Sequence, residues 1–333
     1  MKKSDKNSSN SLDVLVIKPP KGLINVDLKE LWRYRELFGF FVWRDIKVKY
    51  KQTLLGAAWA VLVPFFQMMV FAFIFGRVAK LPSDGLPPSI FYYAALLPWT
   101  YFATSMNMSS QSMVGNAHLL TKIYLPRLIV PTGPCIAGLV DFLIAFTIMV
   151  GMMFYYHIIP PLTVLLLPIL LFIAFGTALG TGLFFSALNV KYRDVRHMMS
   201  FIVQMWMYCT VIIPFSKIPE KFGVFRYLYG LNPMAGVVEG FRWCLLHTRM
   251  FIEKNIETPI IGNILPENLV EGQKVVVKVS EDNHVQAYLS EVVKTPVEPP
   301  FILIGIGIMS VIVIFTFGLY YFKRTEKMFA DIV

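Results

Sequence analysis

Charged residues are scarce in this chain, and long stretches lack them altogether. Only 16% of the 333 residues are Asp, Glu, Lys or Arg, whereas 56% are hydrophobic. Soluble domains carry about 25% charged residues. Residues 52–76 and 85–121 contain no charge, and residues 128–190 contain only Asp141. Because roughly 20 apolar residues cross the hydrocarbon core of a bilayer, this composition excludes a soluble protein and predicts a membrane protein.

The sequence also lacks the short motifs that bind nucleotides, metals or acyl groups. It contains no G-x-x-x-x-G-K-[ST] phosphate loop, no H-E-x-x-H zinc motif and no G-x-S-x-G nucleophile elbow. Its three cysteines have neither zinc-binding nor disulfide-framework spacing. We therefore expect no catalytic, cofactor-binding or metal site here. Asp141 is the only acid inside a predicted span, whereas proton-driven carriers usually hold several intramembrane ionisable groups. Any transport must then be powered by a partner.

The uncharged stretches predict an all-α membrane protein with six transmembrane helices, near residues 54–78, 90–114, 128–155, 162–188, 198–215 and 300–322. The long run 128–188 divides at Pro160 and Pro161, because proline lacks an amide donor and disfavours helix at the residue before it. An even number of spans places both termini on the same side. In domain terms, residues 52–216 form spans 1–5 and residues 299–323 form span 6.

The basic residues orient this arrangement. Of the 31 Lys and Arg residues, 20 lie in the termini and in the connections 116–127 and 189–197. The positive-inside rule then makes both termini cytoplasmic and segment 217–298 external, in a protein of the cell inner membrane. The net charge of +10 is explained by this topology and requires no nucleic acid as a partner. Residues 1–27 and 324–333 are expected to be cytoplasmic tails, the first partly disordered.

Residues 28–51 predict an amphipathic helix that lies along the membrane surface, in contact with membrane lipids. Basic residues share one face and aromatic residues lie broadly opposite, a pattern typical of helices at the headgroup boundary. Two interpretations remain open. The helix either anchors the first span only, or it guides an amphiphilic substrate or docks a cytoplasmic partner. The residues assigned to it are Trp32, Arg33, Tyr34, Phe38, Phe41, Trp43 and Arg44.

The external region should contain two short helices and a β-hairpin. Residues 218–229 and 233–247 are too short to span the membrane, and Asn232 and Pro233 are typical of the start of the second helix. In the insertion 249–298, residues 274–279 and 285–293 are rich in β-formers and flank a turn-like cluster. The insertion could meet an external partner or an emerging polymer, or it could have no role.

Aromatic residues crowd parts of the spans, and their role has two interpretations. Their rings could line a path for sugars, because sugar C–H faces stack on aromatic rings. Alternatively, they form the interfacial aromatic belt found at any headgroup boundary. The belt explains the rings in the middle of span 2 less well. The residues proposed for the path are Trp99, Tyr101, Phe102, Trp206 and Tyr208.

Four blocks of sequence carry a resemblance to a known family. They are residues 44–59, 116–127 and 189–197, and residues 231–236 followed by 239–242. In this order, and on a six-span frame, they resemble type-2 ABC exporter permeases, more closely those that export O-antigen, capsular polysaccharide or teichoic acid. The resemblance implies a homodimer that pairs with two copies of a separate ATP-binding subunit. ATP and Mg would then lie in that partner, and a lipid-linked polysaccharide would pass between the two permeases.

The resemblance also implies roles for particular residues. Segment 116–127 and the loop 189–197 would contact the ATPase through Asn116, Lys122, Tyr124, Pro126, Arg127, Arg193 and Asp194. From the residues alone, the first segment could equally be an ordinary basic loop. Region 217–248 would fold back into the outer leaflet as a gate that includes Asn232, Pro233, Met234, Glu239 and Arg242. A helical pair that rests on the membrane surface is the alternative.

The resulting functional hypothesis is a permease subunit that exports a lipid-linked cell-surface polysaccharide. Two alternatives are kept. One is a type-2 exporter for a small lipid or drug. The other is a membrane enzyme that acts on polyprenyl-linked sugars, which should show clustered His, Arg or carboxylates on its loops.

Overall fold

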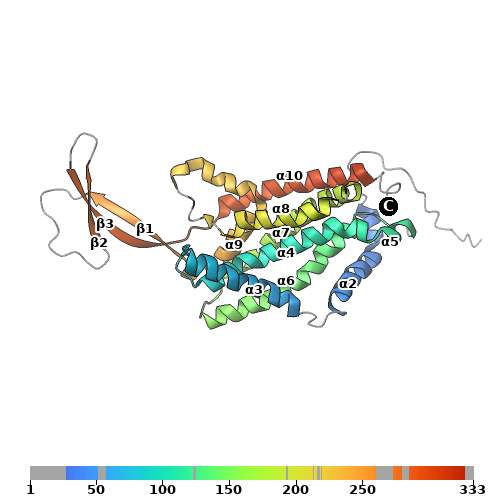
Figure 1. Cartoon of the computed structure of the whole chain (residues 1–333), viewed down its shortest axis with the longest axis horizontal. Helices are drawn as coiled ribbons and strands as arrows, with labels where there is room; N and C mark the ends of the chain where they lie inside the picture. The colour runs from blue at the N-terminus through green and yellow to red at the C-terminus, as the bar shows by residue number, and fades with distance from the viewer. Residues whose placement is uncertain are drawn as a thin grey trace, which may run out of the picture.

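The chain folds into a helical bundle from which a small β-sheet projects. The structure, a computed structural model, describes residues 28–51, 58–122, 125–192, 194–212, 214–215, 218, 220–259, 273–279 and 285–326. In Figure 1 the sheet lies beyond one end of the bundle, and α5 and the C-terminal end of α10 lie at the other. The longest helices are α4 (Pro88–Gly115), α6 (Ile129–Tyr155), α7 (Leu167–Lys191) and α10 (Phe301–Thr325).

Shorter helical elements complete the bundle. The N-terminal part holds α1 (Leu28–Arg33), α2 (Arg35–Lys51), α3 (Ala58–Phe71), the π-helix η1 (Ala72–Val78) and α5 (Ala117–Lys122). The later elements are the 3₁₀ turn η2 (Leu162–Leu166), α8 (Val195–Met207), the π-helix η3 (Tyr208–Ile212), the 3₁₀ segment η5 (Glu220–Leu231), α9 (Pro233–Leu246) and the 3₁₀ turn η6 (His247–Arg249).

Within the described residues, four helical stretches are long and apolar enough to cross a membrane. They are Ala58–Val78, Ile129–Tyr155, Leu162–Lys191 and Phe301–Thr325. The chain is therefore a multi-pass membrane protein. The other two predicted spans correspond to α4, which is 28 residues long and uncharged but rich in Ser, and to α8 with η3. Both elements are less apolar than the four stretches named above, so six spans remain a prediction.

Helix α4 is the centre of the bundle. It packs against α3, α6, α7 and α9, and its residues from Ile90 to Trp99 are almost fully buried. Because neighbouring helices cover it, α4 can carry hydroxyl side chains that would be costly against lipid. Burial among neighbouring helices explains why α4 is only moderately apolar although it has no charged residue.

Small residues let α7 approach its neighbours closely. A Cβ on Gly180 would lie 2.7 Å from the Phe315 Cα of α10, and one on Gly318 would overlap the Gly180 carbonyl. On another face of α7, a Cβ on Gly182 would lie 2.7 Å from the Ser109 Cβ of α4. A Cβ on Gly176 would likewise lie 2.9 Å from a Val311 methyl of α10, so Gly176 and Gly180 together form a close-packing surface.

The region after η3 folds against the bundle. Asn232 caps α9 by accepting a hydrogen bond from the Met234 amide at 3.1 Å, and Pro233 occupies the first turn, both as predicted. Helix α9 is buried along nearly its whole length and packs against α4, α7 and α10. The preceding short helix differs from the expectation: η5 is a 3₁₀ segment broken at Gly223, whose φ is +49°.

The insertion before α10 holds three strands. They are β1 (Phe251–Pro259), β2 (Gln273–Val279) and β3 (Val285–Pro296), in the antiparallel order β1-β3-β2. The predicted hairpin is β2 with β3, in register from Gln273 opposite Glu291 to Val279 opposite Val285. Strand β1 was not predicted, because its Glu, Lys and Asn residues are depleted in strands and its partner lies far along the chain. The insertion is thus a three-stranded sheet.

Candidate functional site: a pocket between four helices

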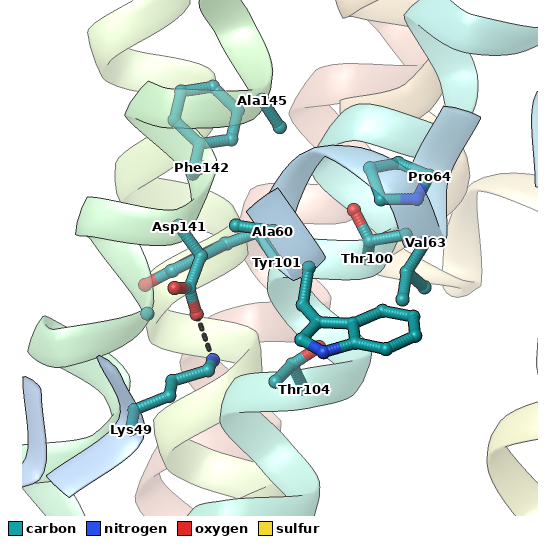
Figure 2. A pocket seen from close by; sticks show the side chains of 12 residues that line it. Lys49, Ala60, Val63, Pro64, Thr100, Tyr101, Thr104, Asp141, Phe142 and Ala145 are labelled. Atoms are coloured by element: carbon teal, nitrogen blue, oxygen red, sulfur yellow. Dashed lines mark hydrogen bonds and ion pairs between the residues drawn. The ribbon is translucent and has the colours of Figure 1, made fainter. Parts of the chain in front are cut away.

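A pocket of about 200 Å³ opens between α2, α3, α4 and α6. Figure 2 shows its lining side chains, with Asp141 of α6 facing Lys49 of α2. Thr100 and Thr104 come from α4, and Trp59 and Val63 from α3 complete the wall. The pocket thus combines one neutralised carboxylate with hydroxyl groups, the exposed Trp59 ring and apolar side chains.

Asp141 connects the amphipathic helix to the bundle. Lys49 Nζ forms an ion pair and hydrogen bond with Asp141 Oδ2, and the Tyr50 hydroxyl donates to Asp141 Oδ1. Burial raises the pKa of the Tyr50 phenol, and the hydrogen bond to Asp141 raises it further, so the phenol stays protonated and donates. A carboxylate in a span is costly unless it is paired or faces water, and in this structure Asp141 is paired.

Sequence reasoning did not identify Lys49 and Tyr50 as those partners. At 100° per residue, Lys49 projects away from the basic face that contains Lys47 and Lys51. A basic residue on the wrong face of an amphipathic helix, with one lone acid in a nearby span, is the signal that could have found the pair.

Tyr101 is the only one of the predicted path aromatics that lines the pocket. Its side chain is buried, its hydroxyl donates to the Cys135 carbonyl at 3.1 Å, and its ring packs against Phe142 with centroids 6.1 Å apart. The hydroxyl therefore joins α4 to α6, while the ring forms part of the pocket wall.

Three other predicted path residues form a cluster inside the protomer. Trp99 lies 5.3 Å from Phe102 and 6.3 Å from Trp206 between ring centroids, and Phe102 lies 4.9 Å from Trp206. Trp99 and Phe102 are buried and do not face lipid. Tyr208 is separate: its ring is exposed, and its hydroxyl accepts a hydrogen bond from Gln204 at 3.1 Å.

Asn232 joins this aromatic cluster to the predicted gate. Trp206 Nε1 donates to Asn232 Oδ1 at 2.8 Å, and Asn232 Nδ2 donates to Thr210 Oγ1 at 2.8 Å. The same Oδ1 caps α9 through the Met234 amide. Residues assigned separately to the path and to the gate thus share one hydrogen-bond network.

The other gate residues, Glu239 and Arg242, form a buried ion pair. Arg242 is fully buried, donates to Glu239 Oε1 at 2.8 Å and to the Val211 carbonyl at 2.6 Å, and stacks over the Phe91 ring at 4.2 Å. Glu239 also accepts from the Phe215 amide at 3.2 Å. These contacts hold α9 against α4 and against the end of η3. An unpaired charge at this position would be strongly destabilising.

The predicted ATPase-coupling residues lie in and beside α5. Lys122 is exposed at the end of α5, and Asn116 Nδ2 donates to the Ser112 carbonyl at 2.8 Å. Pro126 is partly buried. Arg127 donates to the Glu326 carbonyl at the end of α10, so it has a structural contact that the sequence did not indicate. Asp194 precedes α8, while Tyr124 and Arg193 lie outside the described residues.

The predicted amphipathic helix is broken into α1 and α2 at Tyr34. Phe41 is buried against the bundle, and Tyr34 and Phe38 are partly buried beside it. Trp32 and Trp43 are exposed. Arg44 pairs with Asp45 at 2.7 Å, which neutralises an acid on the predicted apolar side, and Arg33 is exposed. The helix therefore presents aromatic side chains both to the bundle and away from it.

The pocket can bind a polar group but holds no catalytic arrangement. Its one carboxylate is neutralised by Lys49, and no described residue beside it forms a nucleophile–base pair. Among the described residues, no three His, Cys, Asp or Glu side chains are grouped to hold a metal ion.

Comparison with known proteins gives a consistent result. Residues 36–246 match the family model described as ABC-2 type transporter. The chain is 28% identical over 216 residues to an O-antigen export system permease protein RfbA of Myxococcus xanthus. The aligned region covers 65% of this chain and 82% of that protein. It is 31% identical over 204 residues to a Klebsiella pneumoniae protein of the same name. Here the aligned region covers 60% of this chain and 76% of that protein. The matched segment includes α2 from Glu36 onward, the pocket and α9, and the chain belongs to the ABC-2 type transporter family.

Proposed function

We propose that this chain is the permease subunit of an ATP-driven exporter that moves a lipid-linked cell-surface polysaccharide outward across the cytoplasmic membrane. The observation that carries the proposal is the similarity, over most of the membrane region, to proteins named as O-antigen export system permeases. All three relatives carry that name, which favours a polysaccharide over a small lipid or drug.

The proposed assembly is a homodimer with two ATP-binding subunits. The chain has no phosphate-binding loop of its own, so nucleotide would bind to the partner. We assign the contact with that partner to α5, which lies at one end of the bundle with Lys122 exposed (Figure 1). Under the positive-inside rule this end is cytoplasmic, and the sheet is external.

The proposed topology has six spans, with α4 and α8–η3 added to the four apolar stretches. Helix α4 is long enough, because 28 residues extend about 42 Å. Four of its serines, Ser105, Ser109, Ser110 and Ser112, are buried, and the helix packs against α6, α7 and α9. We further propose that region 217–248 packs within the outer leaflet, which the burial of α9 among long apolar helices supports.

The path for the polymer is proposed to run between two protomers, beside the pocket. Tyr101 lines this pocket, and Trp59 and Val63 are exposed next to it. Trp99, Phe102 and Trp206 pack against one another inside the protomer, and they are not proposed to touch the polymer. The amphipathic helix, held by Lys49 and Asp141, borders the same pocket.

A deletion strain tests the proposal. Cells of the source organism that lack this chain should accumulate lipid-linked glycan inside and lose it from the surface, and the wild-type gene should restore export. Unchanged surface glycan in the deletion strain would refute the proposed function.

A further inference from the structure

A second, larger cleft of about 750 Å³ lies at the N-terminal end of α4. Three connections form its walls: the loop Pro82–Pro87 before α4, the residues Tyr156 and Ile158 after α6, and the segment Thr248–Phe251 that leads into β1. Its volume lies within the range of about 300–1,000 Å³ that is typical of small-molecule sites.

The backbone around this cleft is unusually constrained. Lys80, Asp84 and His157, with φ of 49°, 50° and 53°, are the only non-glycine residues of the described chain with positive φ. Asp84 lines the cleft, His157 lies between the lining residues Tyr156 and Ile158, and Lys80 lies two residues before the loop Pro82–Pro87. Such conformations cost conformational energy and cluster at binding sites, where the surrounding structure enforces them.

Hydrogen bonds hold the cleft in shape. The Phe251 amide donates to the Asp84 carbonyl at 2.9 Å, and the Val297 amide donates to the Met250 carbonyl at 3.4 Å. The first bond ties the start of β1 to the strained loop, and the second ties the end of the sheet to the same segment. The cleft and the base of the sheet therefore form one unit.

The lining offers the groups that bind sugars. Tyr156 presents a partly buried ring, and the Phe251 ring is 41% exposed. Arg249 is exposed and has no hydrogen-bond or ion-pair partner among the side chains that the structure describes, and Thr248 adds an exposed hydroxyl. Sugar C–H faces stack on aromatic rings, while sugar hydroxyls accept hydrogen bonds from a guanidinium. A mixed wall of this kind suits a hydroxyl-rich ligand better than an apolar one.

The position of the cleft fits a polymer that leaves the protein. The cleft lies at one end of α4 and α5 follows the other end, about 42 Å away for 28 helical residues. Figure 1 shows the sheet projecting beyond the bundle at the end opposite α5.

From these observations we propose that the cleft is a glycan-binding site that holds a segment of the exported polysaccharide as it leaves the membrane. The proposal rests on the proposed function, because that function makes this end external and supplies the glycan. Tyr156 and Phe251 stack on the sugar rings, and Arg249 and Thr248 bind their hydroxyl groups. The sheet continues the surface along which the polymer leaves.

The test is binding of the polysaccharide released from the surface of the producing cells by mild acid. It is titrated against the purified full-length chain in detergent. Tyr156→Ala and Arg249→Gln should each weaken binding about three- to tenfold, the effect of one lost aromatic or charge-assisted contact. Phe154→Ala, which removes a 76%-exposed ring near the same end of α6 that does not line the cleft, is the matched control and should leave binding unchanged. Tyr156→Phe should also bind normally, because stacking survives.

Arg249 is exposed and unpartnered among the described side chains, so its substitution tests binding without disturbing the fold. Wild-type protein that does not bind the polysaccharide, or Tyr156→Ala and Arg249→Gln variants that bind like wild type, would overturn the proposal. Export that still depends on the chain would then leave the proposed function intact. Surface glycan that persists without the chain would instead refute the proposed function itself.

Discussion

The ion pair between Lys49 and Asp141 connects the amphipathic helix to α6, and its strength can be measured. Asp141→Ala and Lys49→Ala should each lower the melting temperature in detergent, because each leaves the other charge unpaired beside the membrane core. The double variant should lose less than the sum. We expect a coupling energy of about 1 kcal/mol, at the low end for contacting pairs, because the Lys49 side chain is 35% exposed.

Lys47→Ala is the control for this cycle, since Lys47 is exposed on the same helix and faces away from Asp141. It should not change the melting temperature. Additive effects of the Lys49 and Asp141 substitutions would show that the pair does not hold the helix in place.

Lys122 and Arg127 should respond differently to charge reversal. Lys122 is exposed on α5, so Lys122→Glu should leave protein level and melting temperature unchanged while it reduces export through the proposed ATPase contact. Arg127→Glu should also lower stability, because Arg127 donates to the Glu326 carbonyl. Surface-glycan assays measure export and immunoblots measure protein level, so the two together separate lost coupling from lost stability. Normal export by Lys122→Glu would argue against α5 as the coupling segment.

The chemistry of single residues was predictable only where it depended on local pattern. The capping role of Asn232 follows from its position before Pro233, and the need of Asp141 for a partner follows from the cost of charge in lipid. The identity of that partner depended on how α2 docks against α6, and the position of Lys49 off the basic face was the one local sign of it. The burial of Trp99 inside the protomer depended on tertiary packing in the same way.

At the scale of elements, the contact between α7 and α10 depends on the absence of a side chain at Gly180. Gly180→Ala should lower the melting temperature, because the added Cβ would lie 2.7 Å from the Phe315 backbone and would push the helices apart. Gly151→Ala in α6 is the control, since nothing lies within 4 Å of its added Cβ. It should be neutral or slightly stabilising, because alanine favours helix by about 1 kcal/mol over glycine.

A Gly180→Ala variant as stable as wild type would mean that α7 and α10 pack less closely than described.

Apolar runs predicted most of the helices, and non-local packing accounts for what they missed. Runs without charge located α3–η1, α6, α7 and α10, because membrane helices satisfy their own backbone hydrogen bonds. Strand β1 was missed because its only strand partner is β3, which begins 26 residues after β1 ends. The break at Gly223 was missed because a positive φ at glycine leaves no mark on hydrophobic periodicity.

At the scale of the whole molecule, the topology makes a direct prediction. Single cysteines at Lys122 and Lys274, in a chain with its exposed Cys209 replaced by serine, should be labelled from opposite faces of the membrane. Lys122→Cys should react only after the membrane is permeabilised, whereas Lys274→Cys should react in spheroplasts. Labelling of both from one face would contradict the odd number of spans, three, that the proposed topology places between α5 and the sheet.

Transport itself tests the central claim most directly. Inverted inner-membrane vesicles that contain this chain and its ATP-binding partner should move lipid-linked glycan into the lumen, where externally added glycosidase cannot reach it. Protection of the glycan should require ATP and should be lost when either protein is absent. Protection that appears without ATP, or that is unchanged in vesicles lacking this chain, would contradict the account.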